Sequence, residues 1–244
     1  MNQRTRFYLL ITILLLLLVL LGFGPRFYLR PFFEQPRHMQ MDRLPWLFII
    51  HGVLMTSWYV LLVVQSALVN TKNIKVHMRL GWGLAVIALF AVISALPVMM
   101  GFAPRLVAEG FLNLNNQDRV WLQNVQWTND MFALITFSTM VVIGLIKRQN
   151  KLLHRTMMLF ASMAFTGPAT GRLMEWAAPE LFIKGTVLIY FIFPVAVFMH
   201  DWIVYRKFPK YAFWAFLALL LLMALTFALP TTEFWKEVFM NHLQ

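Results

Sequence analysis

The sequence predicts an all-α protein, a polytopic membrane helix bundle that forms a single membrane domain over residues 1–244. Its composition is the first reason: 60% of the residues are hydrophobic and 13% are charged, and the mean hydropathy is +0.68, which is too apolar for a water-soluble domain. The second is a set of seven apolar runs. Each is close to the roughly 20 helical residues that cross a bilayer core of about 30 Å. The runs cover residues 7–23, 45–69, 79–101, 130–147, 154–172, 184–205 and 211–230.

The first run, residues 7–23, is interpreted as an anchor helix. Arg4 and Arg6 precede a leucine-rich stretch, as they would in a signal peptide. However, the run exceeds the roughly 7 to 15 apolar residues that are usual in such peptides, and Pro25 occupies the expected cleavage point. We therefore expect this helix to stay attached.

The next four runs are interpreted as a duplicated helical hairpin, with one copy over residues 45–101 and the other over residues 130–172. The segments KVHMRLGWG and LLHRTMMLF place His77 and His154 where a short basic turn meets a long apolar run. Duplicated bundles are common in membranes. The alternative is that Lys, Arg and His simply favour the same membrane boundary in both hairpins.

The run at 154–172 is the least uniform, because small and polar residues and a proline interrupt it. It can also be interpreted as a buried or broken span, which makes six helices the main alternative to seven. The last two runs form a C-terminal helix pair over residues 184–230.

The charges predict the orientation in the membrane. With the N-terminus inside, the inner segments hold twelve basic residues against the single acid Asp201, and so carry the whole net charge of +11. The positive-inside rule then places the N-terminus in the cytoplasm and the C-terminus in the periplasm of a bacterial inner membrane. Topology and anionic lipid headgroups account for the basic balance, so the bilayer is the expected partner and nucleic acid is not. Protein partners stay unknown.

The outer connections, residues 24–44 and 102–129, are long, whereas the inner ones are tight turns. The segment PRFYLRPFFEQP has the aromatic and basic composition of a chain lying at headgroup level. Residues 105–127 are rich in Asn and Gln and are expected to form a solvated loop, with an interfacial helix or a lid as the alternative.

Polar groups at membrane depth are costly and mark candidate sites. An inner set consists of His77, His154 and His200 on three helices at similar depth, with Asp201 adjacent. These histidines are the candidate cofactor-binding residues. The alternative is that they cap helices or anchor them at the interface.

An outer set consists of His51, Asp130 and Arg172, with Asn129 and Glu175 nearby. Helical spacing places His51, Met55, Trp58, Leu62 and Gln65 on one stripe that must face protein. It also places His154 and Arg172 on one helix face. Asp130 begins one apolar run and Arg172 ends another, so the two charges can meet across a hairpin. They then form either a polar pocket or a buried ion pair whose charges satisfy each other.

The segments LPWLFIIHGVLMTSWYVLLVVQSALV, VHMRLGW, NDMFALITF and LLHRTMMLFASMAFTGPATGRL resemble a family of bacterial inner-membrane proteins of the domain-of-unknown-function type. Its pattern is an H-G, W and Q helix, an H-R-R-L-G helix start, and an H-K-R-L-M helix that ends in G-P and R. The resemblance covers about residues 25–206. Met78 and Arg79 replace the usual pair of arginines, and Arg155, Thr156 and Met157 replace lysine, arginine and leucine. It implies a fold and no known chemistry.

Three functions are consistent with these residues. The first is a cofactor protein in which His77 and His154 ligate a b-type haem. The second is binding or transport of a small or lipidic anion, or of a metal held by His51 and a carboxylate, in the outer pocket. The third is an accessory subunit of a membrane complex. The chain has no cysteine and no phosphate loop, HExxH or GxSxG motif, so no enzymatic reaction is predicted.

Overall fold

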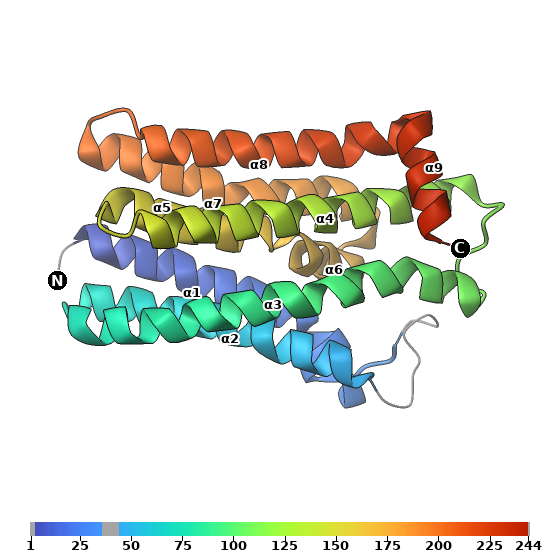
Figure 1. Cartoon of the computed structure of the whole chain (residues 1–244), viewed down its shortest axis with the longest axis horizontal. Coiled ribbons are helices and arrows are strands. Elements are labelled where there is room, and N and C mark those ends of the chain that lie inside the picture. The colour runs from blue at the N-terminus through green and yellow to red at the C-terminus, as the bar shows by residue number, and fades with distance from the viewer. Residues whose placement is uncertain (1–2, 36–43, 244) are drawn as a thin grey trace.

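The computed structural model describes residues 3–35 and 44–243 and is a helix bundle in which the long helices run nearly parallel (Figure 1). The described residues contain no strand. The chain begins at one end of the bundle and finishes at the other, and we call these the N-terminal end and the C-terminal end. The helices are α1 Gln3–Phe23, α2 Trp46–Asn70, α3 Ile74–Ala108, α4 Gln117–Ile146, α5 Lys151–Ala164, α6 Gly167–Ala177, α7 Phe182–Tyr205, α8 Lys210–Ala228 and α9 Glu233–His242.

Six helical segments of the described chain are long and apolar enough to span a membrane, which fits an integral membrane protein. They are built on α1, α2, α3, α4, α7 and α8. The prediction of seven unbroken spans is therefore wrong for residues 154–172, which form the two short helices α5 and α6. The six-helix alternative gives the right number of continuous spans.

Proline chemistry explains the break between α5 and α6. Pro168 has no N–H, and its ring would collide with the carbonyl four residues earlier in a continuing helix, whereas the first turn of a new helix accepts it. Thr166 closes α5 by donating its N–H to Met163 O at 3.0 Å, and it accepts from the N–H of Thr170 at 2.8 Å in the first turn of α6. Because of this break, His154 and Arg172 do not share one helix face as predicted.

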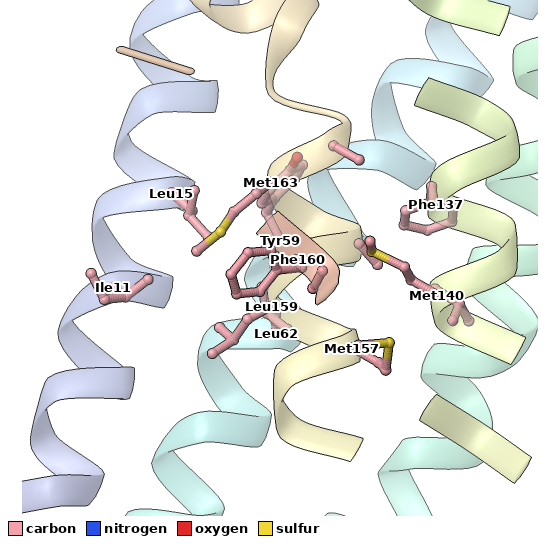
Figure 2. Close-up of a cluster of buried hydrophobic side chains, with 14 of the residues drawn as sticks. Ile11, Leu15, Tyr59, Leu62, Phe137, Met140, Met157, Leu159, Phe160 and Met163 are labelled. Atoms are coloured by element: carbon pink, nitrogen blue, oxygen red, sulfur yellow. The ribbon is translucent and has the colours of Figure 1, made fainter. Parts of the chain in front are cut away.

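The core is centred on α5, which packs mainly against α4 and α8 and also contacts α1 and α7. Figure 2 shows its side chains between those of α1, α2 and α4. Most of its residues from Thr156 onward are buried, so it is enclosed on nearly all sides. Phe160 of α5 is 0% exposed and Phe137 of α4 is 1% exposed. Trp58 and Tyr59 of α2 bond to Ser162 of α5, through its hydroxyl at 3.0 Å and its carbonyl at 2.7 Å. This enclosure explains why a short, less apolar helix is stable here.

Two helices extend well beyond the predicted runs. At about 1.5 Å per residue, the 35 residues of α3 reach roughly 50 Å, past the hydrocarbon core. α4 begins at Gln117, where the Asn116 side chain caps it by accepting the Arg119 N–H at 3.1 Å. The expected loop is therefore wrong for most of residues 105–127, which belong to these two helices, and only residues 109–116 connect them.

A second, smaller core joins α3, α4 and α9 at the C-terminal end. Phe239 of α9 is 0% exposed, and Trp235 donates its indole N–H to the Thr128 hydroxyl at 2.8 Å. The C-terminal helix pair thus continues into a short helix that folds back across the bundle (Figure 1).

The basic turns gather at the N-terminal end. The connections α2 to α3, α4 to α5 and α7 to α8 all lie there (Figure 1). They hold Lys72, Lys147, Arg148, Arg206 and Lys207, and Lys75 lies in the first turn of α3. The two proposed repeats share this placement of the turn, but their second arms differ, since α3 has 35 residues and α5 has 14.

Candidate functional site

The inner histidines do not form one cluster. His77 and His154 face each other with ring centroids 6.3 Å apart and planes at 86°. His154 donates its Nδ1–H to the Gly144 carbonyl at 2.8 Å. His200 belongs to a different group of side chains, where it stacks on Phe7 with ring centroids 3.7 Å apart. The structure therefore brings together two of the three predicted cofactor residues.

His200 joins a closed network at the N-terminal end, which we call the Arg155–Asp201 cluster. Asp201 is 2% exposed, and its Oδ2 accepts from Arg155 at 2.6 Å. Its Oδ1 accepts from the Tyr8 hydroxyl and lies 3.2 Å from His200 Nδ1. The Arg155 guanidinium also donates to the Tyr205 hydroxyl at 3.0 Å and lies over the Tyr8 ring. Both carboxylate oxygens thus have protein partners, which suits a stabilising role.

The C-terminal end contains a cavity of about 930 Å³, which we call the Arg172 cavity. Its walls come from α3, α4, α6, α7 and α8. Arg119 lines it and is exposed, so the cavity reaches the surface. The polar groups that matter most for recognition are Arg26, Gln126, Asn129, Asp130, Arg172 and Glu175.

Three contacts hold α6 and its Arg172 side chain in place. α6 runs against α1 at Gly22, where an added Cβ would lie 2.3 Å from the Ala169 carbonyl oxygen, so only glycine permits this approach. The Arg172 guanidinium lies 4.6 Å from the centre of the Phe23 ring. One N–H donates to the Pro168 carbonyl at 3.1 Å. The packing of α6 on α1 therefore orients the Arg172 guanidinium into the cavity.

Arg172 and Asp130 do not form the direct ion pair that the sequence allows. Among the described residues, no contact within 4.0 Å joins them, although the two charges interact across the cavity. Asp130 accepts from Asn129 at 3.2 Å. A guanidinium has five N–H donors, and only the bond to Pro168 is formed by Arg172 among described residues. Most of its donors are therefore available to a ligand.

His51 lies in a smaller adjoining cavity of about 170 Å³, which we call the branch. The Ser94 hydroxyl donates to the Ala91 carbonyl at 3.0 Å, so it accepts from Nδ1–H of His51 at 3.0 Å. Arg172 and Asp130 line both cavities. The structure thus places the three predicted outer-pocket residues, His51, Asp130 and Arg172, around one connected space.

Two residues that line the cavity, Arg26 and Gln126, were not predicted as site residues. Arg26 follows α1 in a π-helical turn, Gly24–Tyr28, and pairs with Glu175 at 2.9 Å. Gln126 was assigned to a loop. Two features of the sequence indicate that α4 starts before Asp130. Gln126 lies four residues before Asp130, and Asn116 is a good capping residue directly before Gln117.

The charges that line the cavity favour an anionic ligand. Arg26 and Glu175 neutralise each other, whereas Arg172 keeps most of its donors for a guest and Arg119 adds charge at the rim. Apolar side chains such as Phe102 and Phe227 complete the walls.

Comparisons of the chain with models of protein families, with curated proteins and with solved structures give no match. The function of the protein is therefore inferred from the geometry and charge of its cavities.

Proposed function

We propose that this integral membrane protein binds a small organic anion in the Arg172 cavity, as a binding or transport protein. One observation carries the proposal: among the residues that the structure describes, Arg172 has a partner for only one of its N–H groups, and it lines a large cavity. A guanidinium stays charged and matches the planar geometry of a carboxylate or phosphate. Concave, mostly apolar sites with a few oriented polar groups are typical of small-molecule binding.

A metal bound by His51 and a carboxylate receives less support. Among the described residues, no group of three or more His, Asp or Glu side chains is arranged to hold a metal ion. The guanidinium of Arg172 beside His51 also opposes a cation there.

A b-type haem is the second candidate, because of the separation of His77 from His154. An imidazole nitrogen binds a transition metal at about 2 Å, so two axial rings have centres about 6 Å apart. The observed 6.3 Å matches this length. Against it, Met157 and Met158 pack tightly on Gly144 beside His154, and both the Arg172 cavity and the branch lie at the other end of the bundle. A Soret band in the purified protein from a haem-replete host would support haem, and its absence would remove this candidate.

The orientation follows from the basic turns, and we place the N-terminal end in the cytoplasm of a bacterial inner membrane. The Arg172 cavity then faces the periplasm. This localisation agrees with the resemblance to the bacterial inner-membrane family. The third function, an accessory subunit of a membrane complex, predicts no ligand for the cavity.

The test is anion binding by the purified protein in lipid nanodiscs, measured as NMR line broadening of acetate and inorganic phosphate, which detects weak binding. Arg172→Ala should weaken binding by about tenfold to a hundredfold, because hydrogen bonds to charged groups contribute about 1.5–3 kcal/mol. Arg105→Ala is the control, because Arg105 lies near the same end but lines neither cavity. Equal effects of the two variants, or no broadening with the unmodified protein, would contradict the proposal.

A further inference from the structure

The branch and the Arg172 cavity meet at the guanidinium. They share six lining residues, which are Arg26, Phe102, Gln126, Asp130, Pro168 and Arg172. A ligand whose charged group binds Arg172 can therefore extend a second part into the branch.

The walls of the branch are largely hydrocarbon. Apolar side chains from α1, α2, α3 and α4 line it, among them Val19, Met55, Ala95, Val98 and Leu134. This surface favours a guest that has no hydrogen-bonding groups of its own at this depth.

Apart from the residues that the branch shares with the Arg172 cavity, its polar side chains have protein partners. The Tyr28 and Thr56 hydroxyls bond to each other at 2.6 Å. Tyr59 donates to the Ser162 carbonyl at 2.7 Å, and His51 bonds to Ser94 at 3.0 Å. A polar guest would gain little here, because few of these groups are left to bind it.

The volume sets the size of the guest. An apolar protein cavity of about 150 Å³ accommodates a benzene molecule. The branch, at about 170 Å³, therefore accommodates an apolar group of about six carbon atoms.

We propose that the ligand is an amphiphilic anion, with a carboxylate or phosphate ester head on Arg172 and an apolar group of about six carbon atoms in the branch. This inference rests on the proposed function and names its ligand class. A two-chain phospholipid is too bulky for the branch, so the ligand is a free, single-chain or single-ring amphiphile.

The test is a chain-length series. Linear carboxylates from acetate to decanoate are titrated into the protein in zwitterionic nanodiscs, and binding to empty nanodiscs is subtracted. Affinity should rise by about threefold to fourfold for each added methylene until the branch is full, and then level off. Affinity that is independent of length would overturn the inference and leave the proposed function intact. Absence of binding at every length would contradict both.

A variant locates the tail. Ala95→Phe fills the branch and should remove the dependence on chain length while binding of acetate is kept. Ala108→Phe makes the same change at an exposed position of α3 that lines neither cavity, and should keep the dependence. If Ala95→Phe keeps the dependence too, the tail lies outside the branch and the inference is wrong. The series on the unmodified protein decides the question even if Ala95→Phe does not fold.

Discussion

The two ends of the bundle treat buried charge in opposite ways. At the N-terminal end, Asp201 and Arg155 satisfy each other, with Tyr8 and His200 completing the bonds of the carboxylate. At the C-terminal end, Arg172 and Asp130 face an open cavity and make no direct ion pair. Both ends carry an arginine and an aspartate, so the difference lies in what surrounds them.

This contrast indicates a division of roles. In the N-terminal cluster both carboxylate oxygens of Asp201 and two nitrogens of Arg155 have protein partners, and removing one partner leaves an uncompensated charge, so the role of this cluster is stability. An open pair keeps donors and acceptors available, so its role is recognition. Four predictions test the division, from the largest expected effect to the smallest.

Asp201→Ala should lower the free energy of unfolding by about 3–5 kcal/mol, because the Arg155 guanidinium loses its carboxylate partner. The measurement is thermal unfolding in detergent, followed by tryptophan fluorescence. Glu237→Ala, at an exposed position of α9, is the control and should change stability by less than about 0.5 kcal/mol. A loss no larger than that of the control would mean that the N-terminal network is not a stabilising element.

Gly22→Ala should cost about 1–3 kcal/mol of stability, since its Cβ would collide with the backbone of Ala169 and force α6 away from α1. It should also weaken anion binding, because α6 carries Arg172. Gly83→Ala is the matched control, as no atom lies within 4 Å of its added Cβ. Equal stability of the two variants would show that the wall of the cavity is not held by this contact.

Asp130→Asn should strengthen anion binding by about fivefold, because it removes the negative charge that faces the same space as Arg172. The measurement is a titration with acetate and inorganic phosphate in nanodiscs. Weaker binding would indicate that Asp130 contacts a positive group of the ligand, which would make the ligand a zwitterion.

Acidification should loosen α9. Burial lowers the pKa of His242, whose ring stacks on Trp127 with centroids 5.1 Å apart. Folding therefore favours the neutral imidazole. Its contribution to stability is full above the unfolded-state pKa of about 6.5 and is lost as the pH falls through the lower folded-state value. The protection factors of the α9 amides, which are ratios of intrinsic to observed exchange rates and so correct for the intrinsic pH dependence of the chemistry, should fall at low pH, and His242→Gln should abolish this loss of protection. An unchanged loss of protection in the variant would assign it to another group.

Much of the fold could be predicted from the sequence, because the length of an apolar run indicates a membrane-spanning helix and the basic turns indicate which ends of the helices lie together. The break at Pro168 was recognised as an alternative from the small and polar residues around it. The stripe that places Trp58 and Leu62 against protein was confirmed, since they are 1% and 5% exposed. The membrane depth of a side chain and the end of the bundle that carries the basic residues can thus be predicted from local patterns.

What failed depended on packing between distant segments. The packing of α9 on α4, as in the bond from Trp235 to Thr128, joins segments more than 100 residues apart, and no local pattern displays it. His200 was grouped with His154 by depth, although its partners on α1, Phe7 and Tyr8, lie more than 190 residues away in sequence. Sequence spacing gives the height of a side chain in the membrane but not which neighbours surround it.

The most direct test measures unfolding and anion binding together on two near-isosteric variants. Arg172→Gln should lose at least about tenfold in anion affinity and nearly keep its unfolding midpoint. Asp201→Asn should lose stability and, while folded, bind the anion as the unmodified protein does. This opposite pattern would establish that one end binds and the other stabilises. If both variants lose stability and binding in the same proportion, the division between the two ends is wrong.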